Sequence, residues 1–198
     1  MNALSTIDRR MVMSMNREIP QYLTTDEIHQ LLDSCNDKRN HLIINMLWQT
    51  GARVSELLAL TRQNIDFNNR LIKFITLKQR KNNGKSHKKQ MERVIPINPD
   101  LTTEIATFIA EFNPTERLFT ITRVQVFNIL RKLSKETGIR KEIHPHTLRH
   151  SFAVHTLVQG VPLPVVSGLL GHSQISTTLV YLKIVQPDIK NMMSNVRF

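Results

Sequence analysis

The residues of this chain that could carry out chemistry lie mostly near its C-terminus. His146 stands three residues before Arg149, and His172 stands nine residues before Tyr181. A further arginine, Arg53, lies in an early Thr-Gly-Ala-Arg-Val-Ser-Glu-Leu segment. Two arginines could hold the non-bridging oxygens of a phosphate, two histidines could donate hydrogen bonds to it, and a tyrosine hydroxyl could attack the phosphorus. Together these residues are the parts of a phosphodiester-transfer site, and the set requires no metal.

Each of these residues alone has an ordinary structural explanation. A tyrosine beside Leu179, Val180 and Leu182 is usually a core aromatic residue, and a single histidine is more often structural than catalytic. The order of the motifs favours catalysis. Arg-x-x-Glu, a lysine-bearing hairpin, His-x-x-Arg, Gly-His and Tyr follow one another along the chain.

On these motifs the chain resembles the catalytic domain of the tyrosine recombinases, the phage integrase family of site-specific DNA recombinases. The resemblance extends from Tyr22 to Val185 and is carried by residues 50–57, 146–150 and 169–181. It implies a mostly α-helical domain with a small three-stranded antiparallel β-sheet. It also implies that DNA strands are cleaved and rejoined through a 3′-phosphotyrosyl intermediate, without a metal, another cofactor or ATP.

The chemistry assigns a role to each principal residue. Arg53 and Arg149 are expected to bind the non-bridging oxygens, because a guanidinium offers a planar fork of donors that stays charged. Tyr181 is the expected nucleophile. Its hydroxyl, with an ordinary pKa of about 10, is mostly protonated at neutral pH and needs a base, for which His146 is the candidate.

The resemblance assigns three supporting roles. His172 would donate to the phosphate, and Glu56 would orient the first arginine through a salt bridge. A lysine between the second and third strands would protonate the leaving 5′-oxygen. Lys78 matches that position best, with Lys81 and Lys85 as competitors.

The charge of the chain points to a polyanionic partner. The formal net charge is +11 at pH 7, from 27 Lys and Arg against 16 Asp and Glu, so double-stranded DNA is the first candidate. The residues expected to contact DNA form one basic run: Arg80, Lys81, Lys85, Lys88 and Lys89, with Arg93 just beyond. We expect this run to be a loop that is ordered only on a polyanion; the alternative is a solvated, self-repelling loop. A membrane partner is disfavoured because the run is almost free of apolar residues.

Two features favour a cytoplasmic protein. Cys35 is the only cysteine, which excludes an intramolecular disulfide and fits a reducing compartment. Residues 1–20 contain no signal-peptide core, and the apolar stretches are too short to span a bilayer. The resemblance implies a bacterial, archaeal or phage-encoded protein associated with the nucleoid.

The length favours a single main domain. We expect a flexible arm or linker over residues 1–20, a catalytic domain over 21–186 and a tail over 187–198. The resemblance implies that the tail docks on a neighbouring protomer and that a homotetramer forms on paired DNA sites, with possible accessory DNA-bending proteins. A tail folded back on its own domain is the alternative. The chain is either a naturally short member or a fragment without an N-terminal core-binding domain.

Local signals predict the elements that position the site. Thr24 and Glu27 form a capping box at the start of a helix, and Gly51 ends the next helix, so Arg53 falls in the turn after it. His146 lies beside a helix start, where free backbone N–H groups favour an anion. The expected helices cover residues 39–49, 54–60, 100–112, 122–137, 147–159, 164–170, 177–182 and 188–194, and the strands 65–67, 71–77 and 91–97.

Three other functions compete with recombination. His144, His146, His150 and His155 suggest a metal-dependent nuclease, but the acidic residues are scattered, which does not suit a hard-cation site. A catalytically silent DNA-binding regulator with the recombinase fold is a better alternative, although every catalytic position is filled. A type IB topoisomerase shares the chemistry, yet a Gly-His motif nine residues before Tyr181 resembles the recombinases more closely.

Overall fold

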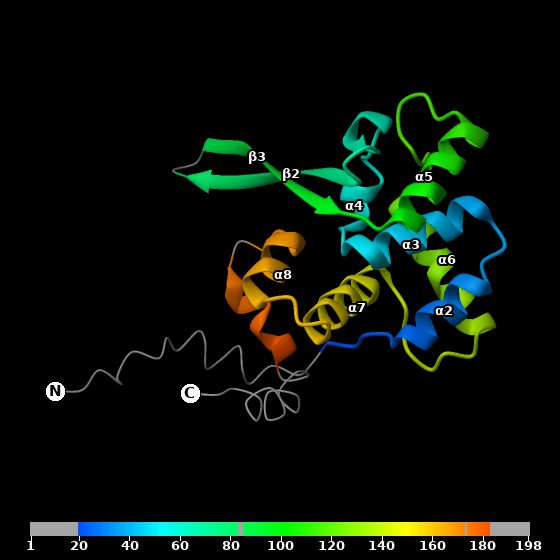
Figure 1. Ribbon diagram of the computed structural model, residues 1–198. Helices are drawn as coiled ribbons and strands as arrows, with labels where there is room; N and C mark the ends of the chain where they lie inside the picture. The colour runs from blue at the N-terminus through cyan, green and yellow to red at the C-terminus, as the bar shows by residue number, and fades with distance from the viewer. Residues whose placement is uncertain (1–19, 83–84, 173, 183–198) are drawn as a thin grey trace.

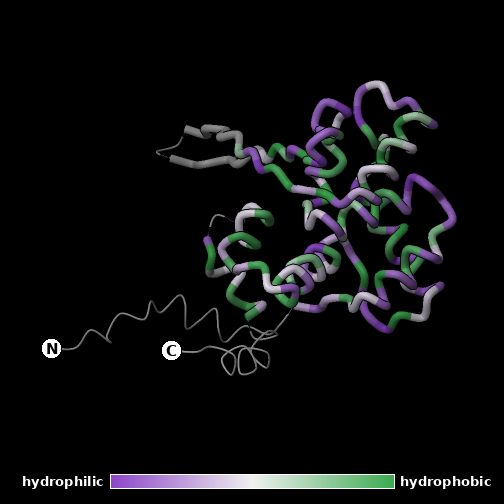
Figure 2. Tube along the Cα trace, in the orientation of Figure 1, coloured by the Kyte–Doolittle hydropathy of each residue, from purple (hydrophilic) through white to green (hydrophobic). Residues whose placement is uncertain are grey.

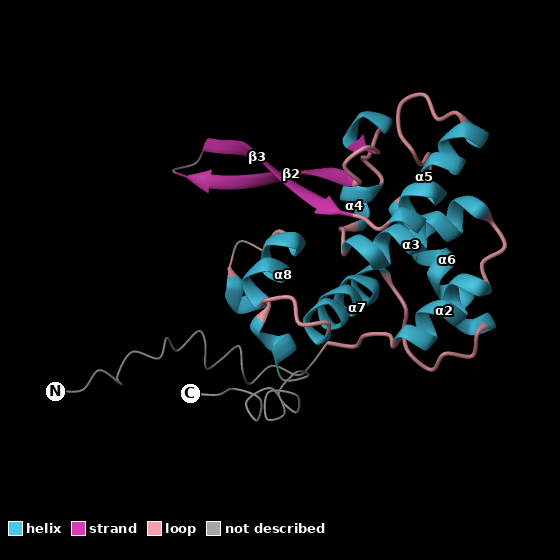
Figure 3. Cartoon of the chain, viewed as in Figure 1, coloured by secondary structure: helices cyan, strands magenta, loops and turns pink. Residues whose placement is uncertain are grey.

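The computed structural model describes residues 20–82, 85–172 and 174–182, with the backbone alone over 77–82, over 85–90 and at 176. Its α-helices are α2 (Thr25–Asp33), α3 (Lys38–Thr50), α4 (Val54–Leu57), α5 (Pro99–Phe112), α6 (Arg123–Glu136), α7 (Pro145–Val158) and α8 (Leu163–Leu170). Short 3-10 helices are η1 (Arg62–Asn64), η2 (Ile175–Thr177) and η3 (Leu179–Tyr181). The strands β1 (Ile65–Asp66), β2 (Leu71–Asn82) and β3 (Lys85–Pro96) form one antiparallel sheet in the order β1-β2-β3. The predicted fold class is confirmed (Figure 3).

Helix α3 lies at the centre of the main core and packs against α5 and α7. Because it is surrounded by other elements, it is apolar on several faces. Its buried apolar residues are Leu42, Ile43, Ile44, Met46 and Leu47. The polar residues that join α2 to α3 lie on the outside, as Figure 2 shows.

A second, smaller core attaches the C-terminal elements to the body. It combines residues of α7, α8 and η3: Phe152, Ala153, Val154, Leu157, Val166, Leu170, Val180 and Tyr181. Helix α8 is apolar along most of its length (Figure 2). The C-terminal part of the site is therefore held mainly by its packing on α7.

The predicted helix start and helix end are both present around α2 and α3. The backbone N–H of Thr24 donates to Oε2 of Glu27 at 2.7 Å, and that of Glu27 donates to Oγ1 of Thr24 at 3.3 Å. Gly51 ends α3 in the left-handed conformation, with φ 58°. A side chain there would be strained, and its Cβ would lie 2.9 Å from Cγ of Phe152. The turn that carries Arg53 therefore requires glycine.

The basic run is not a loop. The prediction ended one strand at residue 77 and began the next at 91, but β2 and β3 continue with regular pairing from Lys78↔Lys89 to Asn82↔Lys85. Antiparallel pairing satisfies the backbone groups whatever the side chains are, so the absence of an apolar pattern did not prevent strand formation. The long hairpin extends past the helical body, above α8 (Figures 1 and 3).

The predicted helix over residues 177–182 was also wrong. The structure has the 3-10 helices η2 and η3 there, with a turn at Thr178 between them. Hydroxyl side chains compete for backbone hydrogen bonds and disfavour a continuous α-helix. The expected arm, the tail over 187–198 and the last helix over 188–194 lie outside the described residues.

Candidate active site

Arg149 lies in the interior, on α7, and joins three helices. Its side chain donates from Nη1 to the carbonyl of Gly51 at 2.6 Å and from Nη2 to the carbonyl of Leu170. These carbonyls stand at the C-terminal ends of α3 and α8, where the helix dipole favours a cation. Arg149 is only 4% exposed and, among the described residues, forms no ion pair. Burial, with the charges of Arg53 and Arg93, lowers the pKa of Arg149 to about 9.

The first arginine is held by Glu56, one turn along α4. The backbone N–H of Arg53 donates to Oε2 of Glu56 at 2.8 Å, and Nη1 donates to Oε1 at 2.8 Å. The Arg53 side chain is 34% exposed, whereas that of Glu56 is 3% exposed. The backbone N–H and Nη1 of Arg53 are thus fixed by Glu56, while the partly exposed side chain leaves the rest of the guanidinium open to a ligand.

Glu56 binds a second arginine that comes from the sheet. Arg93 on β3 donates from Nη1 to Oε1 at 2.9 Å and from Nη2 to Oε2 at 2.6 Å. The hydroxyl of Thr76 on β2 donates to Oε1 at 2.5 Å. Burial alone would raise the pKa of Glu56, but the hydrogen bonds and the charge of Arg93, with the bonds from Thr76 and Arg53, lower it to about 2. The carboxylate is therefore ionised at neutral pH.

Arg93 was predicted as a DNA contact, and the structure places it elsewhere. Its side chain is 9% exposed and is bound to Glu56. The other predicted DNA contacts lie on the outer part of the hairpin: Arg80 and Lys81 on β2, and Lys85, Lys88 and Lys89 on β3. Lys78 pairs with Lys89 in the same register. For these lysines and for Arg80, the structure describes the backbone alone.

The site carries an excess of positive charge. The guanidinium groups of Arg53 and Arg93 are both hydrogen-bonded to the carboxylate of Glu56, and Arg149 lies near enough to interact with all three through its charge. Three positive charges thus face one negative charge. Because the histidines of the site are neutral at pH 7, as described below, this arrangement is suited to an anion with one or two negative charges.

His172 follows the end of α8 and faces the two arginines. Its Nδ1 lies 2.8 Å from the hydroxyl of Thr178, which is fully buried. Burial, followed by the charges of Arg149 and Arg53, lowers its pKa to about 4, so the ring is neutral at pH 7. A hydroxyl that donates to Nδ1 leaves the ring proton on Nε2, which is the tautomer that can donate to a phosphate.

His146 lies in the first turn of α7, and its ring is exposed. The residue at the N-cap is His144, whose Nδ1 accepts the backbone N–H of Thr147 at 3.2 Å. Burial lowers the pKa of His146, and the charges of Arg149 and His144 lower it further. The ring can therefore accept a proton at neutral pH. The centroid of the His146 ring lies 6.5 Å from that of His150, and the centroid of the His150 ring lies 5.9 Å from that of Tyr181.

Tyr181 is buried in η3 and is only 3% exposed. Its hydroxyl lies 2.5 Å from Nδ1 of His150 on α7. Burial raises the pKa of Tyr181 to about 12, and burial with the charges of His146 and Arg149 lowers that of His150 to about 4. The pair is therefore a hydrogen bond between two neutral groups.

His150 was not among the predicted site residues. The available signal was its spacing: His146 and His150 are four residues apart, so they share a face of α7. A residue that follows Arg149 on that face was a candidate to reach Tyr181. No local pattern indicated that it would contact the hydroxyl directly.

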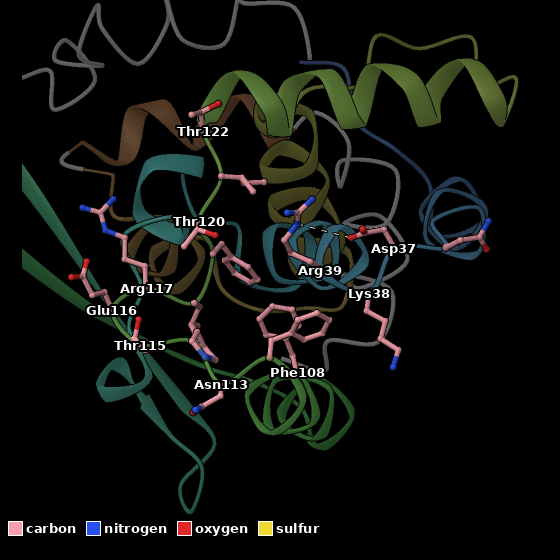
Figure 4. A pocket seen from close by; sticks show the side chains of 16 residues that line it. Asp37, Lys38, Arg39, Phe108, Asn113, Thr115, Glu116, Arg117, Thr120 and Thr122 are labelled. Carbon is pink, nitrogen blue, oxygen red and sulfur yellow. Dashed lines mark ion pairs between the residues drawn. The ribbon is translucent and has the colours of Figure 1, made fainter.

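A separate groove of about 980 Å³ lies away from these residues, between the N-terminus of α3, the C-terminus of α5 and the chain that follows α5. Figure 4 shows its lining, which includes Lys38, Arg39, Phe108, Glu116 and Arg117. Asp37 pairs with Arg39 at its edge. The groove has charges of both signs and contains no predicted site residue. It is therefore distinct from the group of Arg53, Glu56, Arg93 and Arg149.

The histidines do not form a metal centre in the described part of the chain, where no group of three or more His, Cys, Asp or Glu side chains gathers. His155 has a structural environment: Nε2 lies 3.0 Å from the carbonyl of Leu23, and its ring packs edge-on against Trp48. Across the described helices, none is long and apolar enough to cross a membrane.

Comparison with known proteins agrees with this fold. A model of the phage integrase family matches residues 21–186, so the chain belongs to this family, as its motifs predicted. It is 39% identical over 181 residues to a tyrosine recombinase of Pseudothermotoga lettingae, covering 88% of this chain and 60% of that protein. The chain thus spans about 60% of the length of the relatives it matches.

Two solved structures have the same fold. The catalytic domain of bacteriophage HP1 integrase is 26% identical, with a TM-score of 0.61, and the match covers 90% of this chain and 99% of that one. The Tn1549 transposon integrase in complex with transposon right end DNA is 22% identical, with a TM-score of 0.72, and the match covers 90% of this chain and 68% of that one. The second likeness concerns the fold alone.

Proposed function

We propose that this chain is the DNA-cleaving domain of a site-specific recombinase that uses Tyr181 as its nucleophile. The observation that supports this most is a group of three guanidiniums near one carboxylate, beside a buried tyrosine hydroxyl. Such a group binds a phosphodiester and stabilises the further charge that develops when the phosphorus is attacked.

Each step of strand cleavage has a residue that carries it out. Oη of Tyr181 attacks the scissile phosphorus, an O–P bond forms, and the bond from phosphorus to the 5′-oxygen breaks. Arg53 and Arg149 bind the non-bridging oxygens, and His172 donates to one of them. The products are a 3′-phosphotyrosyl enzyme and a free 5′-hydroxyl. Attack by a 5′-hydroxyl of a second strand reverses the steps and rejoins the DNA without ATP.

The hydroxyl proton of Tyr181 passes to a base, and His146 has the suitable charge because its pKa is lowered. In the structure the hydroxyl is hydrogen-bonded to Nδ1 of His150 instead. Attack therefore requires that Tyr181 leave His150 and move towards the arginines. Binding of DNA is the event that we expect to drive this movement.

The leaving 5′-oxygen needs a proton from a lysine, and the hairpin geometry favours Lys78. It lies two residues after Thr76, whose hydroxyl is bound to Glu56. A strand advances about 3.3 Å per residue, so Lys81 lies about 10 Å further along β2 than Lys78. Lys85 is more distant still, because it pairs with Asn82 near the end of the hairpin.

Double-stranded DNA is the proposed partner. The net charge of +11 and the basic hairpin support it, as does the Tn1549 integrase, which has the same fold and was solved with DNA. Strand exchange requires two paired sites and one nucleophile for each strand, which favours a tetramer on DNA. Accessory DNA-bending proteins and association with the nucleoid belong to the same proposal.

Capture of the covalent intermediate tests this function without a known site. Duplexes with a randomised window and a nick just beyond the scissile position are incubated with the protein in EDTA. The short 5′-hydroxyl fragment then diffuses away, and the covalent complex accumulates. Complexes that survive SDS are recovered and sequenced. We expect one enriched family of sequences with the wild-type protein and none with Tyr181→Phe.

The chain offers a matched control, because it has two tyrosines and the other is Tyr22. Tyr22 packs beside Lys141 and against the smaller core, and its hydroxyl has no role in the proposed reaction, so Tyr22→Phe should still form the adduct. Sequence-selective binding with no adduct from the wild-type protein would favour the DNA-binding regulator instead. Enrichment that persists with Tyr181→Phe would exclude Tyr181 as the nucleophile.

A further inference from the structure

We propose that Arg93 is a positioning residue for phosphate cleavage: it balances the charge of Glu56, so that Glu56 orients Arg53 without cancelling its charge. This inference rests on the proposed function. It changes the role of Arg93 from a residue that touches DNA to one that prepares the site.

The orientation of Arg93 is set by Glu56. Both terminal nitrogens donate to the carboxylate, at 2.9 and 2.6 Å, as a parallel fork. The remaining nitrogen, Nε, is buried without a hydrogen-bond partner. A buried N–H without a partner is unfavourable, so the arrangement is explained by the strong two-point bond to Glu56. The Arg93 guanidinium also lies over the ring of Phe74, 5.1 Å from its centroid.

The electrostatic consequence concerns Arg53. Glu56 is nearly fully buried, so it needs a cation in the interior. Without Arg93, Arg53 would be the only cation bound to the carboxylate, the pair would be neutral, and more of its guanidinium would be drawn into contact with Glu56. With Arg93 present, the three groups together keep one positive charge, and Arg53 remains partly exposed for a phosphate oxygen.

Arg93 also connects three parts of the site that are distant in sequence. It lies on the hairpin that carries Lys78, and it is bound to Glu56 on α4. It packs against Gly171, the residue before His172: a Cβ on Gly171 would lie 3.2 Å from Nη1 of Arg93. The Arg93 guanidinium thus joins the hairpin, α4 and the turn after α8.

The test compares Arg93→Gln, Arg93→Lys and the matched control Val94→Thr on a duplex recovered by covalent capture. Val94 is next in the strand and is 49% exposed, so its substitution leaves the Glu56 pair unchanged. We expect both Arg93 variants to bind this duplex with wild-type affinity and salt dependence. Their single-turnover rate of adduct formation should fall by roughly 10- to 100-fold, because Arg53 is misplaced. Lysine should not restore the rate, since it cannot form the two-point bond.

A double-mutant cycle tests whether Arg93 acts through Glu56. In the Glu56→Gln background no carboxylate needs a counter-ion, so adding Arg93→Gln should lower the rate by much less than it does in the wild type. The double variant also keeps the buried pair neutral, which protects folding if Arg93→Gln alone unfolds. If Arg93→Gln lowered the adduct rate equally in the wild-type and Glu56→Gln backgrounds, the inference would be overturned.

Two other results would also contradict it. Wild-type adduct rates with both Arg93 variants would show that the residue is not needed. Weaker DNA binding, with the slope of log K against log salt reduced by about one, would make Arg93 a direct phosphate contact.

A separate measurement does not depend on cleavage. The carboxyl ¹³C shift of Glu56 in selectively labelled protein should titrate at higher pH in Arg93→Gln than in the wild type. If the wild-type protein forms no adduct with any DNA, the proposed function fails, and this titration alone decides whether Arg93 balances Glu56. An unchanged titration would overturn the inference.

Discussion

The hydroxyl of Tyr181 lies 2.5 Å from Nδ1 of His150, and His150 immediately follows the arginine proposed to hold the phosphate. The pKa of the hydroxyl is about 12 and that of the imidazole about 4, so the proton stays on the tyrosine. The proposed nucleophile is thus protonated and buried, and it is bound to the residue that follows Arg149 in α7.

This arrangement predicts the titration of Tyr181. In a Tyr22→Phe background, where one tyrosine remains, tyrosinate absorbance should appear near pH 12 in the folded protein and near pH 10 in denaturant. The folded pKa is raised, so its contribution to stability is present below pH 10 and is lost as the pH rises towards 12. A folded-state midpoint at or below 10 would show that the hydroxyl is not buried as described.

His150 should contribute to stability through the same bond. We expect His150→Leu to lower the free energy of unfolding by about 1–3 kcal/mol, because it leaves the buried hydroxyl of Tyr181 without an acceptor. His150→Asn retains an acceptor near Nδ1 and should be less destabilising. In the Tyr181→Phe background the two substitutions should lower the free energy of unfolding by more similar amounts. Denaturant unfolding of His150→Leu and His150→Asn, each with and without Tyr181→Phe, measures this. The same difference between Leu and Asn in both backgrounds would contradict the hydrogen bond.

Glu56 should make the free energy of unfolding depend on pH in the acid range. Its folded pKa, about 2, is depressed, so its contribution to stability is present above the unfolded value, near 4.5, and is lost as the pH falls towards 2. The contribution is on the order of 3 kcal/mol for a shift of this size. We expect Glu56→Gln to flatten the fall in unfolding free energy between pH 5 and 2. An unchanged slope would mean that another carboxylate is responsible.

The hairpin should dominate the salt dependence of DNA binding. Replacing Arg80, Lys81 and Lys88 with glutamine should weaken binding to all duplexes alike. It should also reduce the slope of log K against log salt by roughly 2.7, because each phosphate that the protein neutralises contributes about 0.9 to the slope. Three other cations, Lys38, Arg39 and Arg117, line the separate groove and provide the control. Equal reductions in slope from both sets would show that the hairpin has no special role.

Much of the site could be predicted because local signals determine it. Gly51 ends a helix, which places Arg53 in the following turn, and one helical turn separates Arg53 from Glu56. The spacing of His146 and Arg149 similarly places both on α7. In each case the positions follow from backbone geometry over a few residues.

The errors and omissions have two physical sources. The outer part of the β2–β3 pairing depends on backbone hydrogen bonds. A basic segment can therefore form strands without the alternating apolar residues by which a strand is recognised in a sequence. The Arg93–Glu56 and His150–Tyr181 contacts join residues 37 and 31 positions apart, and only tertiary packing brings them together. A sequence pattern identifies the charged residue, but the partner decides whether it binds DNA or another side chain.

Gly51 connects the fold to the proposed chemistry, and its substitution should affect both. Gly51→Ala places a Cβ against the ring of Phe152 at a residue whose φ is 58°. The clash and the strained backbone should lower the free energy of unfolding by about 2–4 kcal/mol. Gly138→Ala is the matched control, since Gly138 has φ 69° and nothing within 4 Å of its Cβ position, so it reports the strain alone. Because the Gly51 carbonyl accepts from Arg149, we also expect Gly51→Ala to lower the adduct rate at temperatures where it remains folded. A folded Gly51→Ala protein with the stability of Gly138→Ala and a wild-type rate would contradict both the packing and its link to Arg149.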